Sequence, residues 1–133
     1  MTAHLRDIRV RYAETDQMGV AHHAAYVVWL EECRIELMRA RGADYREQER
    51  QGVLMPVIEL TVRYRRPLRF DDVASCATTV EVKGPSRLAF RTVVSLGETI
   101  CAEAEVTVAA TGRDGRPVRI PEAVLFRISA AAG

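Results

Sequence analysis

Most of the chain after residue 57 alternates between apolar and polar positions, which is the period-two pattern of a strand with one buried face. Ile58, Leu60 and Val62, for example, alternate with charged or hydroxyl-bearing neighbours. Residues 4–12 show the same pattern near the start of the chain. The alternation predicts five strands, over residues 4–12, 58–65, 73–82, 87–96 and 99–108.

Residues 23–41 follow a different period. Their apolar residues recur at three- and four-residue steps, which is typical of a helix with one apolar stripe. Gly42 comes directly afterwards, and glycine commonly ends helices. Residues 24–30 are apolar almost all round, so we expect this first half to be deeply buried. The stripe consists of Tyr26, Val27, Leu30, Cys33, Leu37 and Met38.

Turn-forming residues separate the predicted elements. Gly97 and Glu98 join two alternating runs directly, which suits a two-residue type II′ hairpin. Residues 44–51 predict a short polar helix. The tail from Pro121 is apolar but short, and it predicts a final edge strand or a docking segment, with residues 130–133 frayed.

The predicted order is strand, loop, long helix, then four strands in hairpin sequence. One antiparallel sheet of about five strands with a long helix against one face is the economical α+β arrangement. A single helix covers only part of such a sheet, so we also expect self-association. The polar parity of the strands fits a solvent face or a polar ligand surface; it contains Arg63, Arg65, Arg87, Arg91, Glu103 and Glu105.

The composition narrows the class of protein. A length of 133 residues fits one domain, residues 1–133, and a net charge of +1 gives no basic field for nucleic acid. The N-terminus has no apolar signal-like stretch, and no apolar run reaches the length of about 20 residues that a membrane span needs. The three cysteines are far apart and odd in number, which favours reduced thiols in a cytoplasmic protein.

Asp16 is the first candidate for chemistry. It lies in the acidic, glycine-containing loop before the long helix, close to backbone N–H groups that have no partner within the helix. Such a helix end can stabilise a developing oxyanion, and a carboxylate beside it can act as a base on an acyl compound. The alternative is that Asp16 only caps the helix or shapes a turn.

The loop and the helix start carry a motif that consists of Tyr12, Thr15, Asp16, Gly19, Val20, His23, Tyr26 and Glu31. This motif resembles that of the 4-hydroxybenzoyl-CoA thioesterase family of hot-dog folds. Residues 62–72, a strand end followed by basic residues, Pro67 and Asp71-Asp72, continue the likeness, which covers roughly residues 6–128. The closest likeness is to the bacterial short-chain and aromatic acyl-CoA thioesterases of that family.

The resemblance implies a sheet wrapped around one long central helix, dimers that pair their sheets edge to edge, and tetramers of those dimers. It also implies active sites at the dimer interface and neither metal nor cofactor. Asp16 matches the catalytic carboxylate, as general base or nucleophile, and the backbone N–H of His23 matches the group that polarises the thioester carbonyl. Position 22, commonly aromatic in relatives, is His22 here, which affects the shape of the acyl pocket.

Other residues have both a functional and a structural interpretation. Tyr26 and Trp29 could line an acyl pocket, although such residues are more often core. Glu31 is an alternative catalyst, with an interface or capping contact as the preferred interpretation. His22 and His23 would diverge by about 100° on a helix, which disfavours a shared metal ion. Candidates for the CoA phosphates are Arg66, Lys83, Ser86, Arg87 and Arg91.

These observations predict an acyl-CoA thioesterase that releases a free acid and CoA. Its substrate-binding residues would be Tyr26, Arg66, Lys83 and Arg87, and it would assemble as a homodimer or homotetramer. Two alternatives remain open. The acyl donor could be an acyl-carrier protein, or the chain could be a non-catalytic acyl-CoA-binding module.

Overall fold

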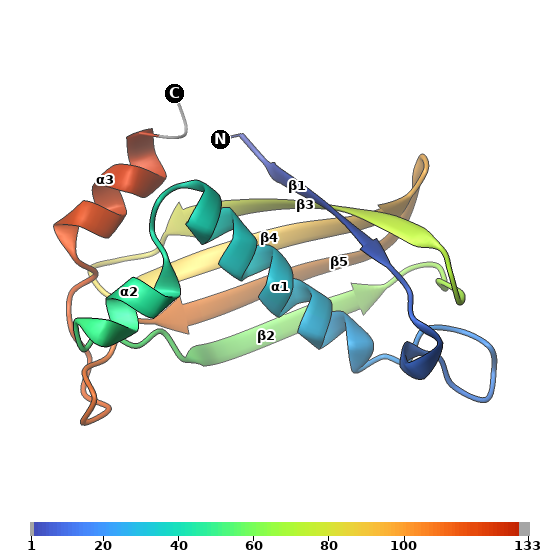
Figure 1. Ribbon diagram of the computed structural model, residues 1–133, viewed down its shortest axis with the longest axis horizontal. Helices are drawn as coiled ribbons and strands as arrows, with labels where there is room; N and C mark the ends of the chain where they lie inside the picture. Colours follow the sequence, from blue (N-terminus) through green and yellow to red (C-terminus); the bar gives the residue numbers. More distant parts are fainter. Residues whose placement is uncertain (1, 131–133) are drawn as a thin grey trace.

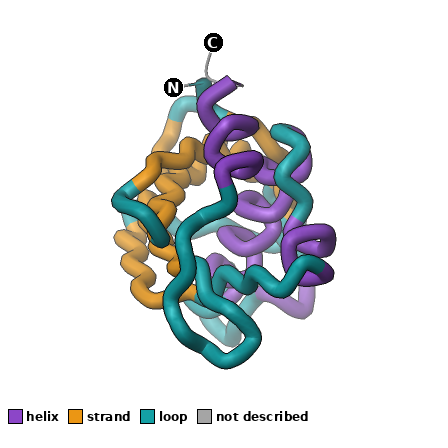
Figure 2. The backbone as a smooth tube through the Cα atoms, turned by 90° about the vertical axis from the view of Figure 1, so that its left-hand side faces the viewer, coloured by secondary structure: helices purple, strands orange, loops and turns teal. Residues whose placement is uncertain are grey.

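A computed structural model describes residues 2–130 of the chain. The five predicted strands form one antiparallel sheet, and the helices lie on one side of it (Figures 1 and 2). The strands are β1 (His4–Arg9), β2 (Val57–Tyr64), β3 (Val73–Val82), β4 (Arg87–Leu96) and β5 (Thr99–Ala109). The helices are the 3-10 turn η1 (Tyr12–Glu14), α1 (Ala25–Ala40), α2 (Tyr45–Arg50) and α3 (Glu122–Ala130).

The strand order in the sheet is β1-β3-β4-β5-β2. The expected hairpin sequence therefore holds for β3, β4 and β5, but it is wrong for β2, which pairs with β5 rather than β3. The segment between β2 and β3 carries the chain from one edge of the sheet toward the other. Leu68 in this segment is fully buried, so the crossing is held in the core.

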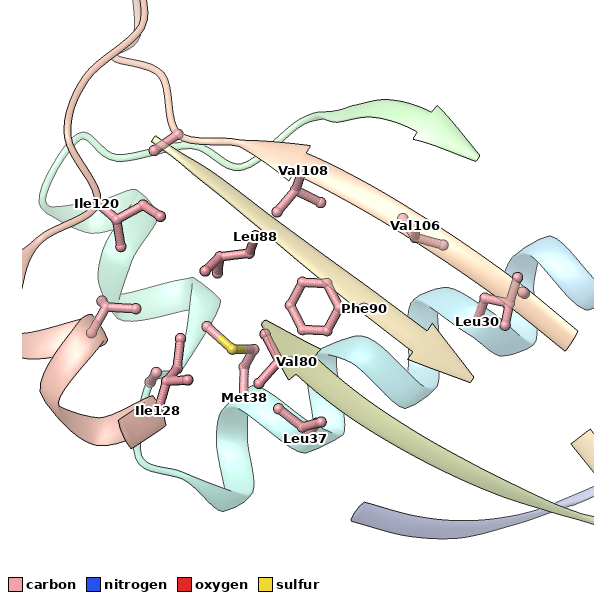
Figure 3. Close-up of a cluster of buried hydrophobic side chains, with 14 residues drawn as sticks. Leu30, Leu37, Met38, Val80, Leu88, Phe90, Val106, Val108, Ile120 and Ile128 are labelled. Atoms are coloured by element: carbon pink, nitrogen blue, oxygen red, sulfur yellow. The ribbon is translucent and has the colours of Figure 1, made fainter. Parts of the chain in front are cut away.

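Helix α1 lies across one face of the sheet (Figure 1). The core beneath it has two parts. Under the C-terminal half of α1, Leu37 and Met38 pack with Phe90 of β4 and Ile128 of α3 (Figure 3). Under the N-terminal half, Trp29 and its neighbours pack against β1 and β3; this second group includes Ile8, Val10, Cys33, Leu68, Ala74, Cys76 and Val94. The apolar stripe predicted for the helix thus faces the sheet, except for Val27, which is exposed.

The first half of α1 is not deeply buried all round, which corrects the expectation for residues 24–30. Tyr26, Trp29 and Leu30 face the core, whereas Val27 is 42% and Val28 57% exposed. These two valines lie on the face that nothing else in the described chain covers. The apolar residues at 24–30 therefore lie on two faces of the helix. One face packs against the sheet, and the other is exposed.

The tail from Pro121 forms helix α3, so the predicted edge strand is wrong and the docking segment is right. Val124 and Ile128 are buried in the larger core, four residues apart on one face of the helix. The guanidinium of Arg41, just after α1, donates to the carbonyls of Thr2 and Ile128, at 2.8 and 3.3 Å. Residues 131–133, for which fraying was predicted, lie outside the described residues.

Several local predictions are confirmed. Helix α2 covers residues 45–50, and its N-cap Asp44 accepts a hydrogen bond from the Arg46 N–H at 2.8 Å. Gly97 has a φ of 60° and begins the predicted tight turn between β4 and β5. The three cysteines are buried with free thiols.

Within residues 2–130, no helix is long and apolar enough to cross a membrane.

Candidate functional site

The loop from η1 to α1 is closed by its own backbone hydrogen bonds. Thr15 and Ala21 form an isolated bridge, and the Asp16 N–H donates to the Val20 carbonyl at 2.9 Å. Gly19 takes a φ of 79°, a left-handed conformation that glycine adopts without a steric penalty. The Ala21 N–H then donates to the Leu68 carbonyl at 2.7 Å, which fixes the loop to the crossing segment. The result is a small rigid loop at one end of α1.

The carboxylate of Asp16 lies half-buried on this loop. Its Oδ1 accepts a hydrogen bond from the Met18 N–H at 2.9 Å, as in an Asx turn. Its other oxygen, Oδ2, has no hydrogen-bond partner among the described residues. The turn-forming role considered for Asp16 therefore occupies only one of its two oxygens.

The backbone before α1 presents three successive N–H groups. The His22 N–H donates to the Glu14 carbonyl at 2.7 Å, and the Ala24 N–H donates to Nδ1 of the His22 ring at 3.0 Å. The His23 N–H, between them, has no acceptor within residues 2–130. The structure thus leaves free the one N–H that the sequence predicted as an oxyanion donor.

Asp16 and His23 line the same cleft, whose volume is about 340 Å³. Its walls combine apolar side chains with a few polar groups, as small-molecule sites commonly do. Tyr26 and Arg66, both predicted as substrate-binding residues, belong to this lining. The remaining wall is formed by Met18, Val20, Ala21, Tyr64, Arg65 and Pro67.

Tyr64, at the end of β2, is a site residue that the sequence analysis missed. Its hydroxyl donates to the His23 carbonyl at 2.8 Å, and its ring meets that of Tyr26 edge to face, with centroids 5.0 Å apart. Burial raises the pKa of Tyr26 to about 12, so this phenol remains neutral in ordinary conditions. In the sequence, Tyr64 is simply the last residue on the apolar parity of its strand, which carries no signal of this contact.

Glu14 is a second residue that the sequence analysis missed. It is only 9% exposed, and its carboxylate accepts hydrogen bonds from the Arg11 N–H at 2.8 Å and from the indole N–H of Trp29 at 2.8 Å. The Arg11 guanidinium adds a contact at 3.2 Å. Burial raises the pKa of Glu14, but the hydrogen bonds from Arg11 and Trp29 outweigh it, so the net pKa lies below the ordinary value. Glu14 is therefore an ionised, buried group beside the site.

In the folded structure of one copy of the chain, Lys83 and Arg87 do not lie near Asp16. Arg87 pairs with Ala109 and Tyr64 pairs with Ala102, so the two lie near opposite ends of β5. At about 3.3 Å per residue, the stretch from Ala102 to Ala109 spans roughly 23 Å. Figure 1 shows the loop before α1 at one end of the sheet and the β3–β4 turn at the other.

The two adjacent histidines do not diverge as expected for a helix. Their rings stack with centroids 4.2 Å apart, because both residues precede the first helical residue, Ala25. Among the described residues, no group of three or more His, Cys, Asp or Glu side chains could hold a metal ion. Glu31 lies outside the cleft and its carboxylate is 4.0 Å from the buried guanidinium of Arg34.

Comparisons with known proteins identify the family of the chain. Residues 10–128 match the model of the thioesterase-like superfamily. The chain is 33% identical over 102 residues to the acyl-CoA thioester hydrolase YbgC of Escherichia coli O6:H1, covering 76% of each chain. It is 43% identical over 76 residues to "Putative acyl-CoA thioesterase YneP" of Bacillus subtilis, covering 57% of this chain and 55% of YneP.

The fold has a close counterpart among solved structures. The crystal structure of the hypothetical protein TT1821 from Thermus thermophilus superposes with a TM-score of 0.89 at 36% identity. The superposition covers 95% of this chain and 97% of that one. Since the family match extends over the loop that carries Asp16 and over strands β2 to β5, the chain belongs to the thioesterase-like superfamily of hot-dog hydrolases.

Proposed function

We propose that the chain hydrolyses acyl-CoA thioesters with Asp16 and the His23 N–H as its catalytic groups. The observation that carries the proposal is that each group has an unused hydrogen-bonding position and that both groups line one cleft. Oδ2 of Asp16 and the N–H of His23 lack protein partners in the described structure, while Oδ1 of Asp16 and the N–H groups on either side of His23 are hydrogen-bonded. A free donor beside a free carboxylate oxygen is the arrangement that acyl transfer needs.

The reaction would begin with the thioester carbonyl oxygen accepting a hydrogen bond from the His23 N–H. Asp16 would remove a proton from water as the water oxygen bonds to the acyl carbon. The C–S bond then breaks, CoA leaves as its thiol after gaining the proton, and the acid remains. Alternatively, the Asp16 carboxylate attacks the acyl carbon itself, and water hydrolyses the resulting anhydride.

Both routes are physically adequate for a thioester. The acyl group is already activated, so an ionised carboxylate and one well-placed oxyanion donor can suffice without a serine–histidine pair. A single oxyanion donor typically contributes on the order of 10²–10³ in rate. The N-terminal end of α1 adds its partial positive charge at the same place.

The CoA portion would lie along the basic rim of the cleft. Arg66 lines the cleft directly, and its guanidinium can bind phosphate with two parallel hydrogen bonds. Lys83 and Arg87 would serve the cleft of a second copy of the chain. When two copies pair along their β2 edges about a two-fold axis, their sheets run in opposite directions. The end of one sheet that carries the β3–β4 turn then lies beside the end of the other sheet that carries the cleft.

The acyl group would occupy the apolar part of the cleft, against Met18, Val20 and Tyr26. Short aliphatic and aromatic acyl groups both fit a wall of this kind. The 4-hydroxybenzoyl-CoA type of thioesterase, to which the loop motif is similar, makes an aromatic acyl group the first to test. We place the enzyme in the cytoplasm, where CoA thioesters are available.

The test is release of free CoA thiol across short, medium, long and aromatic acyl-CoAs, with wild type beside Asp16→Asn. The asparagine keeps the shape and can still accept from the Met18 N–H, but it cannot act as a base or nucleophile. We expect kcat to fall by about 10²-fold or more, within the range for loss of an acid–base group. The best wild-type substrate would identify the acyl class.

Asp114→Asn is the matched control. Asp114 makes the same kind of turn, accepting from the Arg116 N–H at 3.0 Å, in an exposed loop remote in sequence from the cleft. If Asp16 only shapes a turn, the two variants will behave alike. Activity that survives in Asp16→Asn contradicts the proposal. If the wild type hydrolyses only carrier-protein thioesters, the acyl donor is a carrier protein and not CoA. If it binds acyl-CoA without turnover, the result supports a binding module.

A further inference from the structure

We propose that Glu14 is a positioning residue that fixes the separation between Asp16 and the His23 N–H. This inference rests on the proposed function of those two groups. Glu14 lies two residues before Asp16, and it bonds to the segment that carries the other group through both its side chain and its main chain. Together these contacts of Glu14, which we call the bracket, connect the loop that carries Asp16 with the segment that carries His23.

The side-chain arm of the bracket reaches α1. One carboxylate oxygen, Oε1, accepts from the Arg11 N–H and so closes the 3-10 turn on itself. The other, Oε2, accepts from the indole N–H of Trp29 at 2.8 Å, across a separation of 15 residues in the chain. Trp29 is 3% exposed, so this bond is buried and joins the loop to the helix. The same indole packs against Tyr26, a wall of the cleft, with ring centroids 4.7 Å apart.

The main-chain arm reaches the residue before His23. The Glu14 carbonyl accepts from the His22 N–H at 2.7 Å, so the peptide ahead of the oxyanion donor is attached to Glu14 directly. Two residues further along from Glu14, the Asp16 N–H is held by the Val20 carbonyl. Any movement of Glu14 relative to α1 would therefore change the distance between the free oxygen of Asp16 and the free N–H of His23.

The chemistry of the site requires a carboxylate at position 14. Arg11 and Trp29 both point N–H donors at the side chain, and a carboxylate has two oxygens that accept. A glutamine there would place its NH₂ group against one donor and lose that bond. Buried charge-assisted hydrogen bonds are the strong and directional ones, so they suit a residue that sets a distance.

The experiment measures kcat and KM of Glu14→Gln, Trp29→Phe and their double variant, with Asp16→Asn alongside. We expect each single variant to lower kcat by about 10- to 100-fold with little change in KM, the size of effect that a displacement of about 1 Å can produce. The double variant should lose little more than Glu14→Gln alone, because both changes disrupt the same set of hydrogen bonds centred on Glu14.

Glu32→Gln is the matched control. Glu32 also accepts from an arginine, with the Arg6 Nε at 2.8 Å, and also ties α1 to the N-terminal segment, but from an exposed position outside the cleft. It should leave kcat unchanged. All variants are assayed at a temperature where circular dichroism shows them folded. If Glu14→Gln does not fold, the kcat of Trp29→Phe tests the inference.

The outcomes separate the inference from the function on which it rests. An inactive Asp16→Asn together with a normal kcat in Trp29→Phe and Glu14→Gln overturns the role of Glu14 and leaves the proposed function standing. An active Asp16→Asn overturns both. A rise in KM without a fall in kcat would show a role in binding rather than in positioning, and it would also contradict the inference.

Discussion

Residues with the same local geometry can have different roles because of what faces them. Asp16, Asp44 and Asp114 all accept a hydrogen bond from the N–H two residues ahead. Of the three, Asp16 alone lines the cleft that contains an unpaired backbone N–H. The sequence alone suggests the turn-forming role of Asp16, whereas its second role requires the neighbours that the fold supplies.

Tyr64→Phe removes a single oxygen atom and tests whether the Tyr64 hydroxyl helps to hold the oxyanion donor, the His23 N–H, in place. The change removes the hydroxyl that donates to the His23 carbonyl at 2.8 Å and keeps the ring against Tyr26. We expect kcat to fall by about 2- to 10-fold, in line with about 0.5–1.5 kcal/mol for one hydrogen bond. Steady-state kinetics on the best acyl-CoA would measure it.

Tyr12→Phe is the control for this prediction. Tyr12 is 77% exposed, and its ring contacts Phe70 rather than the cleft lining. An equal loss of kcat in both variants would mean that the effect does not come from the bond to His23.

At the scale of elements, α3 shows how a short apolar tail is used. The tail has two apolar residues, Val124 and Ile128, that reach the core from one side of a helix, while Phe126 between them is 72% exposed. Over so few residues a period of two and a period of 3.6 are hard to distinguish. The helix forms because it can seal the C-terminal half of α1 (Figure 3).

Ile128→Ala should lower the free energy of unfolding by about 2–5 kcal/mol, the usual cost of a cavity at a fully buried isoleucine. Ile128 is 1% exposed in the larger core. Phe126→Ala, two residues away, should change it little because that ring is mostly in solvent. Urea unfolding of both variants would measure the difference, and equal midpoints would mean that α3 contributes nothing to stability.

The sequence predicts the elements of this fold well because their patterns are local. The strand alternation and the helix stripe gave all five strands and α1 to within a few residues. The placement of β2 beside β5 could not be derived from the pattern, because pairing depends on contacts remote in sequence. The same limit applies to the site: Asp16 and His23 lie in one motif, whereas the contacts of Tyr64 and Glu14 join segments 41 and 15 residues apart.

At the scale of the whole molecule, the β2 edge of the sheet and one face of α1 expose apolar side chains in the described part of the chain. Val57, Ile58 and Leu60 of the edge strand β2 are 39–48% exposed, and Val28 of α1 is 57% exposed. An edge strand with apolar side chains favours pairing with another chain. Tyr64 belongs both to this edge strand and to the cleft lining, so association along β2 would place a second copy close to the cleft.

Val28→Asp should weaken this association. A charge on the uncovered face of α1 would have to be desolvated in the interface, which is unfavourable without a partner. If the chain dimerises along β2 as proposed, sedimentation velocity should show a shift from the dimer toward the monomer, and activity should fall with it. Leu5→Asp, on the opposite sheet edge and 68% exposed, should leave the sedimentation coefficient unchanged. A Val28→Asp variant that sediments like wild type contradicts pairing through this face.

The bonds from Arg41 to Thr2 and Ile128 bring the two ends of the described chain together, away from the loop that precedes α1 (Figure 1). Such closeness is the condition for circular permutation. A short linker could join the ends, and new ends could open in the exposed turn 113–116. A permuted enzyme of this kind would keep β2, the loop of Asp16 and helix α1 intact, so the order in which the chain is synthesised could be varied independently of its catalysis.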